Sequence, residues 1–100
     1  MELRFTWDPA KAQRNLRVHG VSFETAREIF SDPGQVVFEN YHIEDQGEQR
    51  YTIVGMTRGW NLLVVIYVSR DRDGAEVIHL ISARKADTYE RKIYATSLHA

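Results

Sequence analysis

The sequence predicts an α+β fold, in which two helices precede a central antiparallel β-sheet and one helix follows it. Three observations support this prediction. Helix-start signals lie near both ends of the chain, four strand-like segments lie between them, and tight-turn dipeptides separate the later segments. Because strands joined by tight turns run in opposite directions, we expect the sheet to be antiparallel.

A short strand and two helices are expected first. Apolar and polar residues alternate over positions 3–7, which predicts the strand. Asp8-Pro9 begins a helix, because the carboxylate accepts hydrogen bonds from first-turn amides and proline tolerates the first helical position. His19-Gly20 ends this helix, since glycine suits a left-handed cap. Ser22 caps a second helix, which Asp32-Pro33-Gly34 terminates.

Two strands and a long loop come next. Positions 35–39 resemble a strand, and the polar stretch 40–49 is expected to be a loop. Positions 50–56 alternate again, and Arg58-Gly59 forms a turn into the apolar run 60–68. That continuous run predicts a central strand covered on both faces.

The last strand and the last helix complete the predicted order. Asp73-Gly74 is the strongest signal in a turn over 71–75, and positions 76–82 form the strand that follows it. Asp87 and Glu90 stand three residues apart, as in a capping box, and therefore begin the final helix.

The composition limits the class of protein and the kinds of site. One hundred residues fit one domain, over 1–100. The sequence has no cysteine, so a disulfide or a thiolate metal site is impossible. None of its four histidines stands three or four residues from another, and we expect neither a metal site nor a cofactor. The apolar run is too short to cross a bilayer, and no signal-peptide pattern is present, so a cytoplasmic location is expected.

The net charge of −1 hides an asymmetry along the chain. Positions 31–49 hold five acidic residues and no lysine or arginine, which leaves thirteen basic and nine acidic residues elsewhere. A basic face could therefore coexist with an acidic segment. The alternative is a solvated acidic loop with scattered basic residues.

Several motifs, in order and at matching spacing, resemble those of the BrnT family of toxins from type II toxin–antitoxin systems. The most specific are Trp7-Asp8 with Lys11, Ala12 and Asn15, then His19-Gly20-Val21-Ser22-Phe23, and finally Ile81-Ser82-Ala83-Arg84-Lys85-Ala86 with Glu90-Arg91 and Tyr94.

This resemblance implies a RelE-like fold and a ribonuclease that cleaves RNA and inhibits translation. It also implies a BrnA-like antitoxin with a ribbon-helix-helix fold, through which alone the protein would contact operator DNA. Where relatives often carry arginine before the Ile-Ile-Ser-Ala-Arg run, this chain has His79.

RNA cleavage without a metal requires a base, cations that stabilise the phosphate, and an acid. Arginine suits the second task and histidine suits the first or third. The candidate catalytic residues are Arg50, Arg70, His79 and Arg84, which lie on or beside the central strands. If Ile78 and Leu80 point into the core, His79 lies on the opposite face. The alternatives are a structural Arg84, an Arg70 that merely belongs to a turn, and a His79 without a role.

Five further residues are candidates for RNA binding: Glu48, Lys85, Tyr94, Lys11 and His19. Glu48 could orient an arginine, act as a base, or be a solvated loop acid. The spacing of Tyr94 in its helix favours partial core packing over stacking on a base. Lys11, Asn15 and His19 share one helix face, which could contact RNA or an antitoxin, or form a buried junction.

Two functions therefore remain open from the sequence. The first is a metal-independent endoribonuclease toxin that an antitoxin neutralises. The second is a non-catalytic partner-binding module that acts as a corepressor with its antitoxin.

Overall fold

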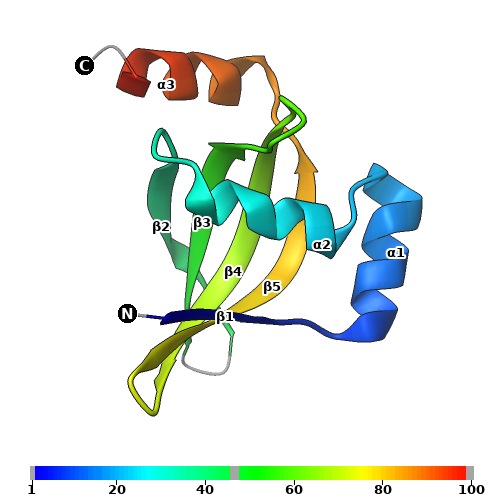
Figure 1. The fold of residues 1–100 in the computed structure, drawn as a ribbon, viewed down its shortest axis with the longest axis vertical. Helices are drawn as coiled ribbons and strands as arrows, with labels where there is room; N and C mark the ends of the chain where they lie inside the picture. The colour runs from blue at the N-terminus through cyan, green and yellow to red at the C-terminus, as the bar shows by residue number, and fades with distance from the viewer. Residues whose placement is uncertain (1, 46–47, 99–100) are drawn as a thin grey trace.

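The computed structural model describes residues 2–45 and 48–98, with the backbone alone for residues 39–45. The described chain forms one sheet with helices around it (Figure 1). Its elements in order are β1 (Glu2–Thr6), α1 (Pro9–His19), α2 (Phe23–Ala26), the 3₁₀ helix η1 (Arg27–Ser31), β2 (Val36–Asp45), β3 (Glu48–Met56), β4 (Leu62–Arg72), β5 (Ala75–Lys85) and α3 (Thr88–Leu98).

The sheet has five strands in the order β1-β5-β4-β3-β2. The four later strands pair with their neighbours in antiparallel fashion, as predicted, and β1 pairs in parallel with β5. The first strand of the chain therefore lies beside the last one. In the sequence, the helical elements α1, α2 and η1 and the other three strands separate them. The expected α+β class is confirmed, and the sheet is mostly antiparallel.

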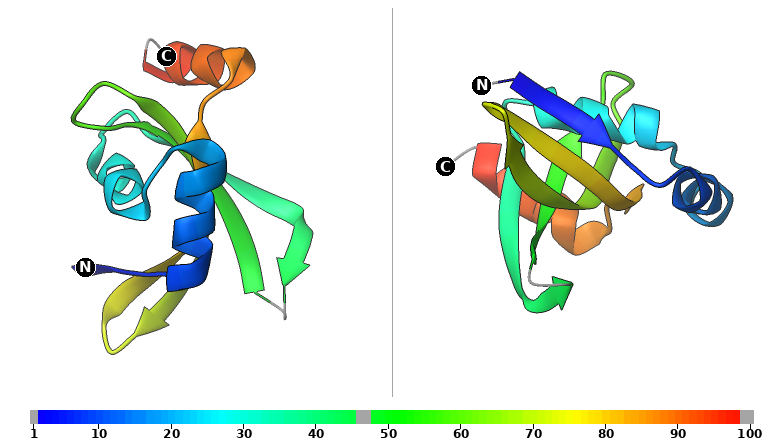
Figure 2. Two further views of the ribbon diagram at one scale, coloured as in Figure 1. Left: turned by 90° about the vertical axis from the view of Figure 1, so that its right-hand side faces the viewer. Right: turned by 90° about the horizontal axis from the view of Figure 1, so that it is seen from below.

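One face of the sheet packs against α2 and η1, which cross it in Figure 1 and lie to its left in the left view of Figure 2. Their side chains Phe23, Ala26 and Ile29 are fully buried against the sheet. Gly55 of β3 permits this close contact, since a Cβ there would lie only 2.8 Å from the Cβ of Ile29. The main core also contains the sheet residues Ile53, Leu63, Val65, Tyr67, Ile78, Leu80 and Ala83.

Helix α1 stands beside β5 rather than over a face of the sheet (Figure 1). Asp8 caps its first turn by accepting hydrogen bonds from two backbone amides, and Gly20 ends it with φ of 71°. Both caps were predicted from the sequence. Asn15, on the inner side of α1, is buried and bonds to the backbone of Ala83 in β5. The helix is therefore fixed to the strand by a side-chain amide.

Helix α3 covers one end of the second sheet face. Its Tyr94 packs with Val54, Leu62, Val64 and Ala86 in a smaller core. The predicted capping box is present, since the backbone amides of Asp87 and Glu90 each donate to the other's carboxylate, both at 2.8 Å. Among the described residues, none of the helices combines the length and the apolarity that a bilayer crossing requires.

The predicted loop over 40–49 is wrong for most of its length. Strand β2 continues to Asp45 and β3 begins at Glu48, while residues 46–47 lie outside the described part of the chain. The polar stretch forms strand because its backbone pairs across the hairpin, with an irregularity between Asn40 and Glu44. Strands β4 and β5 are likewise longer than expected, and the second helix changes to 3₁₀ geometry at Arg27.

Candidate active site

Three of the four candidate catalytic residues gather on one face of the sheet. Arg50 of β3 pairs with Val68 of β4, which in turn pairs with His79 of β5. Directly paired residues point to the same face, so these three side chains form a row across the sheet. Arg70 follows Val68 by two residues and points the same way. The backbones of Arg50 and His79 are roughly 10 Å apart, because neighbouring strands lie about 5 Å apart.

These side chains line a small pocket of about 110 Å³. Lys11 closes it from α1, and Ile81 and Glu48 contribute from β5 and the start of β3. The full lining is Lys11, Glu48, Arg50, Val68, Arg70, His79 and Ile81. The pocket thus contains one lysine, two arginines, one histidine and a single carboxylate. This surplus of basic side chains can bind a phosphate group.

Glu48 holds Arg70 in a two-pronged ion pair. The guanidinium donates from Nε and Nη2 to the two carboxylate oxygens of Glu48. Hydrogen bonding to Arg70 lowers the pKa of Glu48, and the same bond raises the pKa of Arg70. An arginine has five N–H donors, so three remain for another anion. Of the interpretations open from the sequence, this geometry favours a Glu48 that orients an arginine.

The ring of His79 is held by the neighbouring strand β1. Its Nδ1 lies 2.8 Å from Oγ1 of Thr6, which is its direct partner in the parallel pairing. Burial lowers the pKa of His79 below 6.5, and the positive charges of Arg70 and Lys11 lower it further. The negative charges of Glu48 and Asp8 act in the opposite direction and raise this pKa. These effects favour the neutral imidazole, which is the form that can accept a proton.

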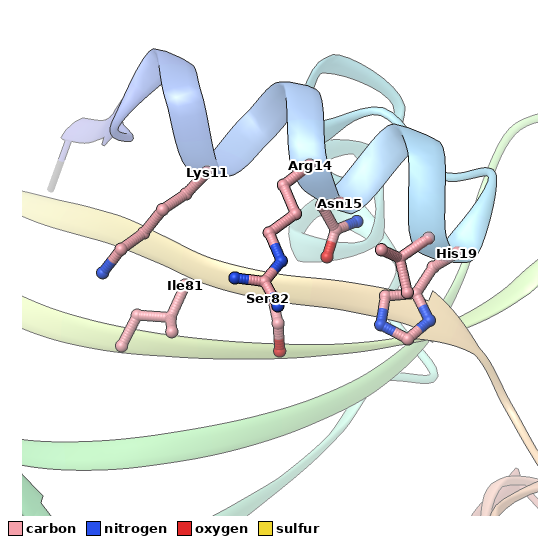
Figure 3. Close-up of a pocket in the computed structure, with 7 residues that line it drawn as sticks. Lys11, Arg14, Asn15, His19, Ile81 and Ser82 are labelled. Carbon is pink, nitrogen blue, oxygen red and sulfur yellow. The ribbon is translucent and has the colours of Figure 1, made fainter.

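A second, larger cleft of about 320 Å³ adjoins this pocket between α1 and β5 (Figure 3). Lys11 and His19, both predicted to bind RNA, line it from α1, together with Arg14. Ile81 lines both cavities. It lies at a bulge, because Ile66 pairs with Ser82 while Tyr67 pairs with Leu80. An unpaired strand residue is often turned toward a site in this way.

Arg84 is separate from this group. It points to the same sheet face but pairs with Val64, six residues along β4 from Arg70, which amounts to roughly 20 Å along the strand. Its guanidinium donates to both carboxylate oxygens of Glu90, at 2.8 and 2.7 Å. The expectation that all four residues share one patch therefore holds for three of them, since strand geometry separates the fourth.

Tyr94 and Lys85 also lie away from the pocket. Tyr94 is buried, and its hydroxyl donates to Asp32 at 2.7 Å. Burial and this hydrogen bond raise the pKa of Tyr94 to about 12. Lys85 pairs with Leu63 and therefore lies on the opposite face of the sheet. Asn15 is buried as well, which leaves Lys11 and His19 as the exposed members of their helical stripe.

Three residues at the site were missed by sequence reasoning: Thr6, which lies beside His79 without lining either cavity, and Arg14 and Ile81, which line the cavities. Thr6 reaches His79 only through the parallel pairing of β1, which no tight turn indicates. Strand alternation places Ile81 on the same face as His79, so Ile81 could have been found, whereas the bulge at Ile81 has no sequence signal. Arg14 could have been found, because it lies three residues after Lys11 on the same helix side.

Among the side chains that the structure describes, those of residues 2–38 and 48–98, no three from histidine, aspartate or glutamate are grouped so that they could hold a metal ion. A carboxylate is present in the pocket as Glu48, and it is engaged by Arg70.

Comparisons with known proteins confirm the resemblance. A family model described as the ribonuclease toxin BrnT of type II toxin–antitoxin systems matches residues 7–90. Among curated proteins, no sequence matches. The fold is similar to that of the Brucella abortus ribonuclease toxin BrnT, solved at 1.1 Å resolution, with a TM-score of 0.58 and 23% identity over 88% of this chain and 100% of that one. Since the family model spans most of the sequence, the chain belongs to the BrnT family of ribonuclease toxins of type II toxin–antitoxin systems.

Proposed function

We propose that this protein is a metal-independent endoribonuclease that cleaves RNA at the pocket formed by Arg50, Arg70 and His79. Cleavage of cytoplasmic RNA would arrest translation, and a ribbon-helix-helix antitoxin would neutralise the protein. The observation that carries this proposal is geometric: Arg50, Arg70 and His79 come from three neighbouring strands, point to the same face of the sheet and line one pocket.

The proposed reaction is attack of the RNA 2′-oxygen on the adjacent phosphorus. With Nδ1–H donating to Thr6, the Nε2 lone pair of His79 takes the proton of the 2′-hydroxyl. The new P–O bond closes a 2′,3′-cyclic phosphate as the bond to the 5′-oxygen breaks. Lys11, whose ammonium carries a proton into the same pocket, protonates the leaving oxygen.

The arginines act on the charge that develops at the phosphate. Arg70 retains three N–H donors after its pairing with Glu48, and Arg50 stands on the far side of Val68 from His79. Donors fixed before the reaction stabilise the transition state without reorganising. Glu48 thus acts through Arg70 as a positioning residue. We propose that Arg84 takes no part in the reaction and instead stabilises the start of α3 through its ion pair with Glu90.

Antitoxin binding is expected to use the exposed sheet face that holds the pocket, since a protein seated there would exclude RNA. The antitoxin would then be the part of the complex that contacts operator DNA. Its ribbon-helix-helix fold is inferred from the family resemblance.

The test is cleavage of a single-stranded RNA by the purified protein in the presence of EDTA. We expect products with 2′,3′-cyclic phosphate and 5′-hydroxyl ends, and a loss of about 10²-fold or more in rate for His79→Ala. Arg91→Ala, a surface substitution on α3, is the matched control. Wild-type protein that leaves RNA intact would instead support the partner-binding corepressor.

A further inference from the structure

The cleft between α1 and β5 has the composition of a site for a polyanion. It is lined by Lys11, Arg14, Asn15, Val18, His19, Ile81 and Ser82, none of which is acidic. Figure 3 shows Lys11, Arg14 and His19 descending from α1 toward the floor that Ile81 and Ser82 form on β5. Its volume of about 320 Å³ exceeds that of the pocket beside it, about 110 Å³.

The cleft adjoins the candidate active site, with which it shares two lining residues. Lys11 and Ile81 line both cavities, Lys11 from the helix and Ile81 from the bulge of β5. An RNA strand whose scissile phosphate lies between Arg50 and His79 must continue beyond the pocket. The shared lining offers it a path along α1 that keeps its phosphates beside positive charge.

The length of the cleft corresponds to several nucleotides. From Lys11 to His19, α1 rises roughly 12 Å at about 1.5 Å per residue. A stacked nucleic-acid strand advances about 3.4 Å per nucleotide, so the cleft spans about three of them. Arg14 lies near the middle of this distance.

The lining offers little to distinguish one base from another. The amide of Asn15 is already engaged, because Nδ2 donates to the carbonyls of Val21 and Ala83 and Oδ1 accepts from the amide of Ala83. Val18 and Ile81 present apolar atoms, which can contact any sugar or base. Contacts to phosphate bind without regard to sequence.

From these observations, and resting on the proposed ribonuclease function, we propose that the α1–β5 cleft binds the single-stranded RNA flanking the cleavage site, with Arg14 as its main phosphate ligand. The site contributes affinity for several nucleotides beyond the scissile phosphate and contributes no base preference.

The test uses a single-stranded oligoribonucleotide that is methylated at every 2′-oxygen, which prevents cleavage because the nucleophile has no proton to lose. We expect Arg14→Ala to weaken its binding about fivefold and to reduce the slope of log K against log salt concentration by about 0.7. The loss should be equal for probes of different sequence. Arg14→Lys should retain most of the binding, since lysine also binds phosphate.

Arg17→Ala is the matched control, because Arg17 is exposed on the same helix and does not line the cleft. Both positions tolerate alanine, a strong helix former. Equal binding by the Arg14→Ala and Arg17→Ala variants would overturn the proposal, as would an Arg14→Ala variant that loses only antitoxin binding. Failure of the wild-type protein to bind or cut RNA would instead overturn the proposed function itself.

Discussion

Asn15 occupies the place of a strand neighbour for Ala83. Its side-chain amide accepts from the backbone N–H of Ala83 at 3.1 Å and donates to the carbonyl of the same residue at 2.8 Å. A third bond, at 3.0 Å, reaches the carbonyl of Val21 after the helix turn. Strand β1 pairs with β5 only as far as His79, so Asn15 satisfies the edge of β5 beyond that point. The motif near the N-terminus that contains Asn15 is therefore hydrogen-bonded to the motif near the C-terminus that contains Ala83.

Replacing Asn15 should be costly for stability. Asn15→Ala leaves three buried backbone groups without this partner, and each unsatisfied group costs about 1–3 kcal/mol, reduced where water enters. We expect the free energy of unfolding in urea to fall by about 3 kcal/mol. Asn15→Asp should cost at least as much, because a carboxylate would face two carbonyl oxygens. A loss no greater than that of Gln13→Ala, an exposed position on α1, would contradict this role.

The pair of Arg84 and Glu90 should make stability depend on acid pH. Hydrogen bonding to Arg84 lowers the pKa of Glu90 against the opposing effect of burial. As pH falls below 4.5, the Glu90 carboxylate of the unfolded chain is therefore protonated before that of the folded protein. The stabilisation is complete above pH 4.5 and is lost as pH falls through the pKa of Glu90 in the folded state.

The measurement is urea unfolding of the wild type and Glu90→Gln across this range. We expect a difference of about 1 kcal/mol at pH 7, since Arg84 is partly exposed and water screens the pair, and convergence in acid. The exposed Glu24→Gln is the control. A difference that persists unchanged below the pKa of the folded state would show that the ion pair is not its cause.

The charge of Lys11 should influence His79. Burial and the charges of Arg70 and Lys11 lower the pKa of His79. Lys11→Gln removes one of these charges, so the pKa of His79, measured by NMR titration of the ring, should rise toward 6.5. Arg17→Gln should leave the titration in place. An unchanged or lower pKa in Lys11→Gln would separate Lys11 from the pocket.

Thr6 is expected to position His79. Thr6→Val removes the oxygen that lies 2.8 Å from Nδ1, and a bond worth about 1 kcal/mol corresponds to a fall in kcat of somewhat under tenfold. KM should change little, because Thr6 does not line the pocket. Thr6→Ser retains the hydroxyl and should restore most of kcat. Equal rates for Thr6→Val and the wild type would remove this assignment.

Much of the fold could be predicted because its signals are local. Asp8-Pro9, Gly20, Ser22 and the capping box of Asp87 and Glu90 each act within one helical turn, and each appears as predicted. The parallel pairing of β1 depends on contacts across more than seventy residues. The adjoining ends of β2 and β3 have a polar sequence that resembles a loop. They form strands through backbone pairing, which leaves no apolar pattern in the sequence.

The candidate site was predictable in part for a similar reason. The alternation of side chains along the strand correctly placed His79 on the face opposite to the core residues Ile78 and Leu80. The alternation then fails at the bulge at Ile81, after which Ala83 is the buried residue. Register along the strands, which no sequence signal fixes, separates Arg84 from Arg70 and brings Arg50 into line with His79.

The most direct test of the whole account is the cleavage rate of Arg70→Gln, measured under single turnover in EDTA beside the charge-matched Arg91→Gln on α3. If the pocket performs the reaction, the first rate falls by about 10²-fold or more while the second equals that of the wild type. An Arg70→Gln protein that cuts RNA at the wild-type rate would contradict the assignment of the reaction to this pocket.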